Sequence, residues 1–274
     1  MSDRDEPYFG WIRGAEDKSD LNDDRSESFD SLDRRFGPSG KVKTTRGAVT
    51  LRPWMPPICD QGDLQSCTAH ALAAAMGFEH QGLRASRLQL YYFSRSYERR
   101  TSIDSGARLH NAIRSLRDYG VAPEKDWPYD QSKVTDQPNR GAASTAGEHK
   151  ISRYAALSGG AEYRLCLERG YPFVIGIHHT DDFWSDRSQA TGMIYTPGPD
   201  EPALHSHAVC VIGYAQPCSR ARDYAPKNQP DSGGLYYEIR NSAGPDWGDE
   251  GHFWVPADYL ENPRLAGDAW TIRK

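Results

Sequence analysis

The sequence lacks any long hydrophobic run. Its longest apolar stretches, residues 71–78 and 171–177, are far shorter than the roughly 20 residues that a membrane-spanning helix needs. The first six residues have neither the basic start nor the apolar centre of a secretory signal. We therefore expect no membrane span, and a protein that is either cytoplasmic or exported by a non-classical route.

Cysteines at metal-binding or disulfide spacing are also missing. The five cysteines are odd in number, widely spaced and contain no CxxC pair, which excludes a disulfide framework and a thiolate zinc site. A metal site from His178, His179, His205 and His207 is an alternative, but no cysteine or carboxylate spacing supports it, so surface histidines are the simpler interpretation. We expect no metal and no cofactor.

The sequence also lacks the clustered Lys and Arg residues that would form a basic surface stripe. Residues 1–33 hold 11 acidic and 4 basic side chains, so of the total of 38 acidic and 33 basic, 27 acidic and 29 basic remain for the rest of the chain. The acidity is local and the remainder is nearly neutral, with Lys and Arg interleaved with acids. This pattern argues against a nucleic acid partner, and we expect a monomer.

The N-terminal region is polar and acidic. Residues 1–46 contain few hydrophobic side chains, and Gly37 to Arg46 has the composition of a linker, so the domain is predicted to begin near Gly47. Within this extension Phe29, Leu32 and Phe36 recur at the spacing of one helix face. A disordered acidic tail and a docked inhibitory propeptide both fit this composition.

Two hydrophobic periodicities divide the rest of the chain. The helical period predicts helices over residues 67–81, 87–97 and 109–116, the first capped by Ser66. Short runs rich in Val, Ile, Tyr and Phe at 172–178, 207–214, 235–240 and 252–255 predict strands, with one helix near 161–169. Helices segregated from strands predict an α+β chain with a mainly helical lobe at about 60–150 and a mainly β lobe at about 151–274.

Cys67 is the candidate nucleophile. A thiol at the first residue of a helix lies at unpaired N–H groups and the positive end of the helix dipole, which stabilise a thiolate. His207 opens an apolar strand and is the best candidate for the imidazole that such a thiol needs. Asn241 follows another predicted strand and can fix the orientation of that ring.

Three segments, in chain order, resemble the nucleophile, histidine and asparagine motifs of the papain family of cysteine peptidases: Gln61 to Cys67, His207 to Tyr214 and Arg240 to Phe253. The resemblance extends from about Val49 to the C-terminus, and Ser66-Cys67-Thr68-Ala69 is most similar to a bacterial branch of the family. It implies a papain-like fold with the active site in the cleft between a helical and an antiparallel barrel-like lobe. It also implies that Gln61 helps to form the oxyanion hole. The residues that the resemblance implies to bind substrate are Ser105, Gly106, Gly176 and Trp247.

Several residues depart from the family pattern. Ala243 stands where the family has a tryptophan that covers the contact between the asparagine and the histidine, which predicts a wetter contact here. Thr68 and Gln65 are further departures beside the nucleophile. Three functions therefore stay open: a peptidase made as a zymogen, a transpeptidase that uses the same thioester, and a catalytically impaired peptide-binding module. Cys166 and Cys210, in apolar surroundings, are interpreted as core residues.

Overall fold

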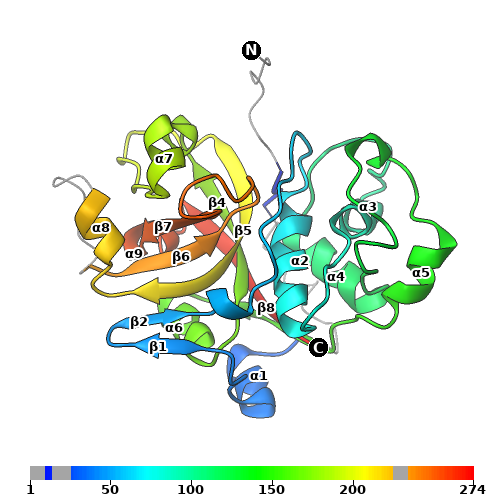
Figure 1. Cartoon of the computed structure of the whole chain (residues 1–274), viewed down its shortest axis with the longest axis horizontal. Helices are drawn as coiled ribbons and strands as arrows, with labels where there is room; N and C mark the ends of the chain where they lie inside the picture. The colour runs from blue at the N-terminus through cyan, green and yellow to red at the C-terminus, as the bar shows by residue number, and fades with distance from the viewer. Residues whose placement is uncertain (1–9, 14–25, 225–233) are drawn as a thin grey trace.

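The computed structural model describes residues 10–13, 26–224 and 234–274, which form a helical and a β lobe side by side (Figure 1). The helical lobe contains α2 (Cys67–Glu79), α3 (Arg87–Ser96), α4 (Leu109–Asp118) and α5 (Arg140–Ala146). The first three match the periodic segments of the sequence to within two residues. The α+β prediction with two unlike lobes is confirmed.

The β lobe is built on one antiparallel sheet. Within the described residues eight strands form it, with the order β1-β2-β5-β4-β8-β3 and with β6 and β7 continuing from β5. Their bounds are β1 (Lys43–Thr45), β2 (Ala48–Thr50), β3 (Arg153–Leu157), β4 (Phe173–His179), β5 (His205–Ala215), β6 (Tyr236–Arg240), β7 (His252–Pro256) and β8 (Ala266–Arg273). The sheet is accompanied by α6 (Gly160–Glu168), α7 (Asp186–Thr191), α8 (Ser219–Tyr224) and α9 (Ala257–Leu260). The hydrophobic pattern predicted β4 to β7 but missed β1, β2, β3 and β8.

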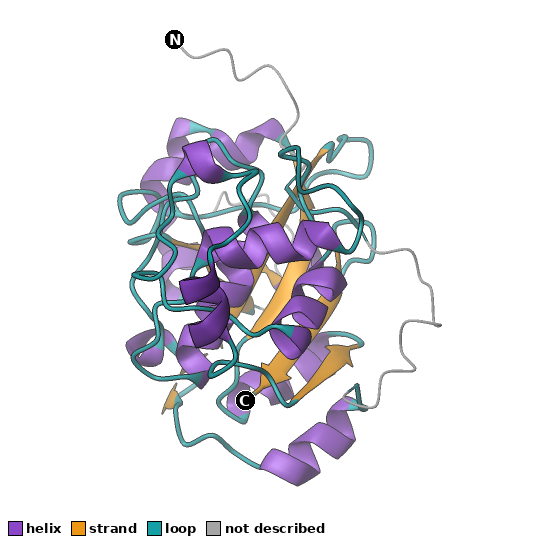
Figure 2. Cartoon of the chain, turned by 90° about the vertical axis from the view of Figure 1, so that its right-hand side faces the viewer, coloured by secondary structure: helices purple, strands orange, loops and turns teal. Residues whose placement is uncertain are grey.

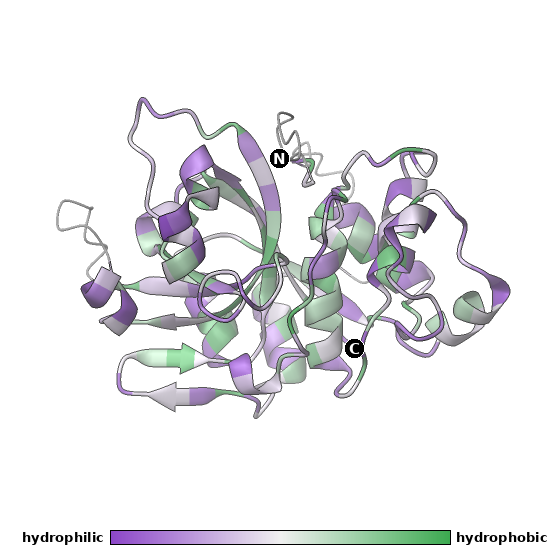
Figure 3. Ribbon diagram, turned by 45° about the horizontal axis from the view of Figure 1, so that its top comes forward, coloured by the Kyte–Doolittle hydropathy of each residue, from purple (hydrophilic) through white to green (hydrophobic). Residues whose placement is uncertain are grey.

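Helix α2 lies where the two lobes meet, and all of its residues are buried. Apart from Thr68, His70 and Glu79 its residues are apolar or small, so much of it is green or pale in Figure 3, and alanines of high helix propensity fill its centre. It contacts β5 on one side and α3 and α4 on the other. Among the described residues, no helix combines the length and the apolarity that crossing a bilayer would require.

The predicted amphipathic helix of the N-terminal region is α1 (Phe29–Phe36), in which Phe29 and Leu32 are buried and Ser28 caps the first turn. It docks beside β3 at the lower edge of the molecule (Figure 2), where the Glu27 N–H donates to the Tyr154 carbonyl at 3.2 Å. The linker prediction for residues 37–46 is partly wrong. Lys43–Thr45 forms β1, and the β1/β2 hairpin joins the sheet because Ala48–Thr50 pairs with the end of β5.

Candidate active site

Cys67 is the first residue of α2 and is fully buried. Its Sγ accepts a hydrogen bond from the Ala208 N–H at 3.3 Å, so the sulfur lies against the backbone of β5, one residue after His207. Ser66 precedes the helix as predicted, but its hydroxyl does not cap it. The hydroxyl instead lies 2.6 Å from the Tyr129 hydroxyl and 3.3 Å from His70 Nδ1.

His207 and Asn241 come together as the sequence predicted. The His207 Nε2 lies 2.9 Å from Asn241 Oδ1, which also accepts from the Ser242 N–H at 2.8 Å. Because Asn241 Oδ1 is an acceptor, Nε2 carries the ring proton and Nδ1 is the basic nitrogen. This Nδ1 is buried without a hydrogen-bond partner. The ring is therefore fixed in the tautomer that can take a proton from a thiol.

Gln61 connects the two lobes. Its side-chain Nε2 donates to the Leu64 carbonyl at 2.8 Å and its Oε1 accepts from the Ser242 hydroxyl at 2.5 Å. Its backbone N–H also donates to the Ser242 carbonyl at 2.8 Å. An amide nitrogen has two protons, so one N–H of Gln61 remains after the bond to Leu64. The residue next to Asn241 thus fixes the orientation of this amide.

Aromatic rings cover His207. The Phe183 ring centroid lies 6.0 Å from that of His207, and Trp247 stacks on Phe183 at 5.3 Å. His207 is 2% exposed and Asn241 4%. The prediction of a wetter contact, based on Ala243, is therefore wrong, because Phe183 and Trp247 close this side of the imidazole.

Residues 10–13 lie in the cleft, between β5 and α2 (Figure 1). A Cβ placed on Gly10 would be only 2.5 Å from the Cys67 sulfur, so the backbone of Gly10 lies directly on the thiol. The segment is held by backbone pairing. The Ala107 N–H donates to the Gly10 carbonyl at 3.0 Å, and the Ile12 N–H donates to the Ala107 carbonyl at 3.1 Å, which forms a parallel bridge.

Trp11 fills a pocket beside this segment and is 2% exposed. Its ring occupies the space over Gly176, where any side chain would overlap it, and lies 5.1 Å from the His178 ring. The indole N–H donates to Asp268 Oδ2 at 3.2 Å, and the Ser206 hydroxyl donates to the Trp11 carbonyl at 2.8 Å. Gly176 therefore does border a roomy pocket.

Sequence reasoning missed Gly10, Trp11 and Asp268. The one available signal was the cluster Tyr8-Phe9-Gly10-Trp11-Ile12, the only concentration of apolar residues in the first 28 positions. Asp268 gave no signal, because nothing local distinguishes it from other acidic residues of the chain.

The charge state of the site is set by burial. Burial raises the pKa of the Cys67 thiol to about 11, although the hydrogen bond from Ala208 opposes the shift. Burial also lowers the pKa of His207 to about 4, against the effect of Asn241. Near neutral pH both groups are therefore uncharged with residues 10–13 in place. Burial therefore disfavours the expected thiolate in this covered form, because desolvation outweighs the helix terminus.

A family model described as papain family cysteine protease matches residues 50–267, most of the chain. The chain belongs to the papain family of cysteine proteases. It is a cysteine-type peptidase by family, and its two-lobe fold is that of papain.

Known proteins support this assignment. A peptidase C1-like protein of Acanthamoeba polyphaga mimivirus is 29% identical over 97% of this chain and 86% of its own length. Cysteine proteinase 3 of Entamoeba histolytica is 25% identical over 79% of this chain and 65% of its own. The crystal structure of xylellain, a cysteine protease from Xylella fastidiosa, superposes with a TM-score of 0.74 and 28% identity, covering 98% of this chain and 96% of that one.

The remaining predicted site residues of this papain-family chain surround the cleft. Ser105 and Gly106 directly precede Ala107, and Gly106 is positioned by its N–H bond to the Tyr91 hydroxyl at 2.9 Å. Trp247 lines an open groove of about 600 Å³ together with Gln61 and Trp184. Trp11 is not among the residues that line this groove.

Of the four histidines of β4 and β5, His179 and His207 are buried, so the interpretation as surface histidines was wrong for these two. His179 is 1% and His207 2% exposed, because both faces of these central strands are covered. His205 stacks on His179 at 5.3 Å and lies 2.6 Å from an Asp181 carboxylate oxygen. Across the described ranges, no three His, Cys, Asp or Glu side chains gather as metal ligands.

Proposed function

We propose that this chain hydrolyses peptide bonds with Cys67 and His207, and that residues 10–13 block its cleft until they are displaced. The observation that carries the proposal is the covered thiol: Gly10 lies on Cys67, whose sulfur contacts the residue after His207, and the His207 Nδ1 has no hydrogen-bond partner. In the covered form Sγ is bonded to Ala208 instead. Displacement of Gly10 would admit water and substrate and free the sulfur to meet Nδ1.

The proposed chemistry follows from the orientation of each group. Nδ1 of His207 takes the proton of the Cys67 thiol, the sulfur attacks the peptide carbonyl, and the imidazolium returns the proton to the leaving amine. The Cys67 N–H and the remaining N–H of Gln61 stabilise the oxyanion. Water then releases the acyl group, with His207 as the base. Asn241 keeps the ring in the required tautomer throughout.

Residues 10–13 block the site without placing their own hydrogen-bonded carbonyls in the proposed oxyanion hole. The Gly10 carbonyl accepts from the Ala107 N–H, and the Trp11 carbonyl accepts from the Ser206 hydroxyl. Neither carbonyl is bonded to Gln61 or to the Cys67 N–H, so neither occupies the proposed oxyanion hole. This supports inhibition by residues 10–13. The predicted boundary at residue 46 keeps α1 and β1 in the same extension, although both are built into the β lobe.

Peptide substrates are proposed to occupy the space that the segment leaves. Ser105, Gly106 and the following Ala107 would pair with an extended substrate backbone. The pocket at Gly176 would take a side chain in place of Trp11, and the groove along Trp247 would hold the leaving side of the substrate.

The test uses a thiol-directed epoxide on the full chain and on its Trp11→Ala variant, with Arg34→Ala as the control. Trp11→Ala removes the ring that anchors the segment, whereas Arg34 is exposed on α1. We expect a Cys67 adduct that forms faster in Trp11→Ala than in the parent or the control, and none in Cys67→Ala. Peptide products heavier by one water distinguish hydrolysis from transpeptidation. A Trp11→Ala chain without a Cys67 adduct and without turnover would refute the proposal.

A further inference from the structure

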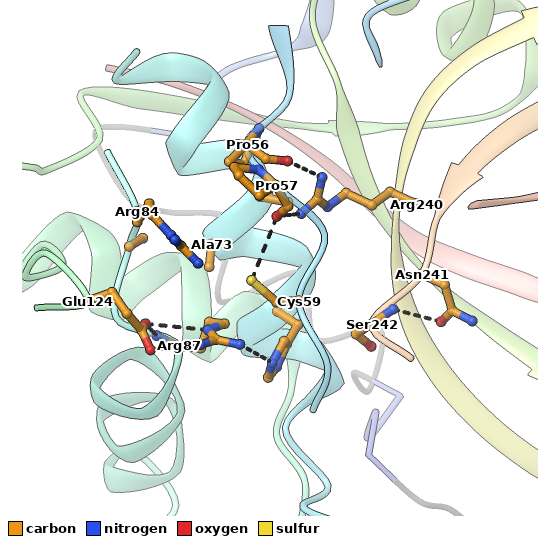
Figure 4. Close-up of a pocket in the computed structure, with 13 residues that line it drawn as sticks. Pro56, Pro57, Cys59, Ala73, Arg84, Arg87, Glu124, Arg240, Asn241 and Ser242 are labelled. Carbon is orange, nitrogen blue, oxygen red and sulfur yellow. Dashed lines mark hydrogen bonds and ion pairs between the residues drawn. The ribbon is translucent and has the colours of Figure 1, made fainter. Parts of the chain in front are cut away.

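A small cavity lies behind the proposed catalytic residues, between the two lobes (Figure 4). It has a volume of about 30 Å³, enough for one or two water-sized particles. Arg84 and Arg87 border it from the helical lobe, and Arg240, the last residue of β6, borders it from the β lobe. Figure 4 shows the guanidinium of Arg84 directed toward the same space as the Cys59 thiol.

The charges around this cavity do not balance. Three guanidinium groups face one lining carboxylate, Glu124, which is already paired with Arg87 at 2.7 Å. Arg87 also donates toward His70 Nε2 at 3.3 Å, and His70 is held uncharged because burial lowers its pKa to about 3. The lining groups therefore carry an excess of two positive charges, which is the electrostatic signature of an anion site.

Arg240 is the decisive residue. It is only 7% exposed, its guanidinium donates to the carbonyls of Pro56 and Pro57, and it makes no ion pair with any described carboxylate. Buried charges in proteins are normally paired, because desolvation without a counter-charge is costly. Burial lowers the pKa of this guanidinium, the direction expected of a cation that lacks an opposite charge.

We propose that this cavity binds one small inorganic anion, with chloride as the representative ligand, between Arg84, Arg87 and Arg240. The volume excludes nucleotides and peptides, and the exposed Arg84 provides the entrance from solvent. Guanidinium groups are suited to this role because they are always charged and weakly hydrated.

The anion would stabilise the junction that carries the active site. Asn241 and Ser242 line the same cavity, and they orient His207 and Gln61 through the bonds at 2.9 and 2.5 Å. An anion that joins arginines from both lobes would hold these two residues in place from behind. The site is separate from the cleft that residues 10–13 cover.

The test compares thermal unfolding of the full chain in sodium chloride and in sodium gluconate at equal ionic strength, because gluconate is too large for the cavity. Binding to the folded state alone raises the midpoint, so we expect chloride to raise it by a few degrees. The difference should vanish in Arg84→Met and Arg84→Gln and persist in Arg34→Met, which removes the same charge from an exposed site on α1. Equal midpoints of the parent in the two salts, or a difference that survives in both Arg84 variants, would overturn the proposal.

Crystals soaked in bromide give a second readout that does not depend on activity or stability. We expect an anomalous peak within hydrogen-bonding distance of the Arg84 and Arg240 guanidinium groups. A peak without a chloride effect in solution would indicate an adventitious ion only, and absence of a peak would also count against the site. If the Cys59 thiolate supplied the counter-charge, the unfolding midpoint of the parent would not depend on chloride, whereas that of Cys59→Ser would. This result would also overturn the proposal.

Discussion

At Cys67 two physical effects act on the same thiol in opposite directions. The start of α2 favours a thiolate, whereas complete burial under Gly10 favours the neutral thiol. Burial has the larger effect on the pKa of the thiol in the covered form. The helix terminus can therefore lower this pKa only when residues 10–13 leave and solvent enters. The same reasoning applies to His207, whose pKa burial holds at about 4.

Replacement of Gln61 by Ala tests the oxyanion hole at the level of one residue. In the Trp11→Ala background we expect kcat to fall by about 10²- to 10³-fold, because one donor to the developing charge is lost. Gln189→Ala is the matched control, since Gln189 lines the same groove but bonds the Trp184 carbonyl. Steady-state kinetics on a peptide ester and a peptide amide provide the measurement. A change of less than about 3-fold in Gln61→Ala would remove this residue from the mechanism.

Asp268 sets the chemistry of the pocket that Trp11 fills. Its carboxylate accepts from the indoles of Trp11 at 3.2 Å and Trp270 at 2.6 Å, so it should favour substrate side chains that donate a hydrogen bond or carry positive charge. Asp268→Asn retains the shape, and Asn tolerates the positive φ of 58° at this position. We expect kcat/KM for a peptide with Arg in this pocket to fall about 10-fold or more, with little change for Phe. Equal losses for the two peptides would contradict this assignment.

At the scale of elements, two parts of the N-terminal extension, α1 and residues 10–13, have different roles. Helix α1 buries Phe29 and Leu32 beside β3, at the lower edge of the molecule in Figure 1, so its hydrophobic face contributes to stability. Residues 10–13 are attached by two backbone hydrogen bonds with Ala107 and by the Trp11 ring in its pocket. Side chains add hydrogen bonds from Ser206 to the Trp11 carbonyl, from Arg108 to the Arg13 carbonyl and from Arg13 to the Pro263 carbonyl. A short attachment of this kind can be displaced without unfolding the domain.

Gly10→Ala tests how closely the segment approaches the sulfur. The new Cβ would lie 2.5 Å from Sγ and 3.3 Å from the Gln65 carbonyl, so the segment must move away. Overpacking of this kind costs about 1–3 kcal/mol, and we expect the epoxide to label Cys67 about 10-fold faster. Gly147→Ala, where a Cβ meets open space, should label at the rate of the parent. Equal rates in the two variants would show that the segment does not restrict access.

At the scale of the whole molecule, buried histidines make the covered form sensitive to acid. Burial holds the pKa of four histidines at about 3 or 4, below their ordinary 6.5: His70, His179, His207 and His252. Between pH 6.5 and 4 the unfolded chain therefore binds more protons at these sites than the folded chain, and stability falls as the pH falls. Glu79 and Glu238, whose pKa burial raises, act in the opposite direction. Because four histidines act against two glutamates, the net effect is that the folded chain loses stability as the pH falls.

The free energy of unfolding should therefore decrease by several kcal/mol between pH 6.5 and pH 4, at about 1.4 kcal/mol per pH unit for each net proton. Urea titrations at intervals of half a pH unit measure this slope. His179→Phe removes one of the four sites while it retains a ring beside Phe183. The slope of its free energy of unfolding against pH should therefore be smaller by the contribution of about one proton. A stability that is constant over this range in the parent would contradict the prediction.

The sequence by itself determined the features that local patterns encode. Helical periodicity located α2, α3 and α4, and short runs rich in Val, Ile, Tyr and Phe located β4 to β7. The placement of Cys67, His207 and Asn241, with the resemblance to papain-family motifs that adds Gln61, gave the candidate site residues. Strands β1 and β2 were missed because the segment has the composition of a linker, and pairing with β5 makes it part of the sheet. Strands β3 and β8 were missed because they are recognised by pairing with each other over more than 100 residues and not by a pattern within either segment.

Only the tertiary structure decided what lies against these residues. That Gly10 covers Cys67, that Trp11 reaches Asp268 across 257 positions of sequence, and that Arg240 is buried without a carboxylate partner among the described residues all depend on long-range packing. The physical reason is that burial and desolvation, which set the charge state of a thiol, an imidazole or a guanidinium, are properties of the folded surroundings and leave no trace in local sequence.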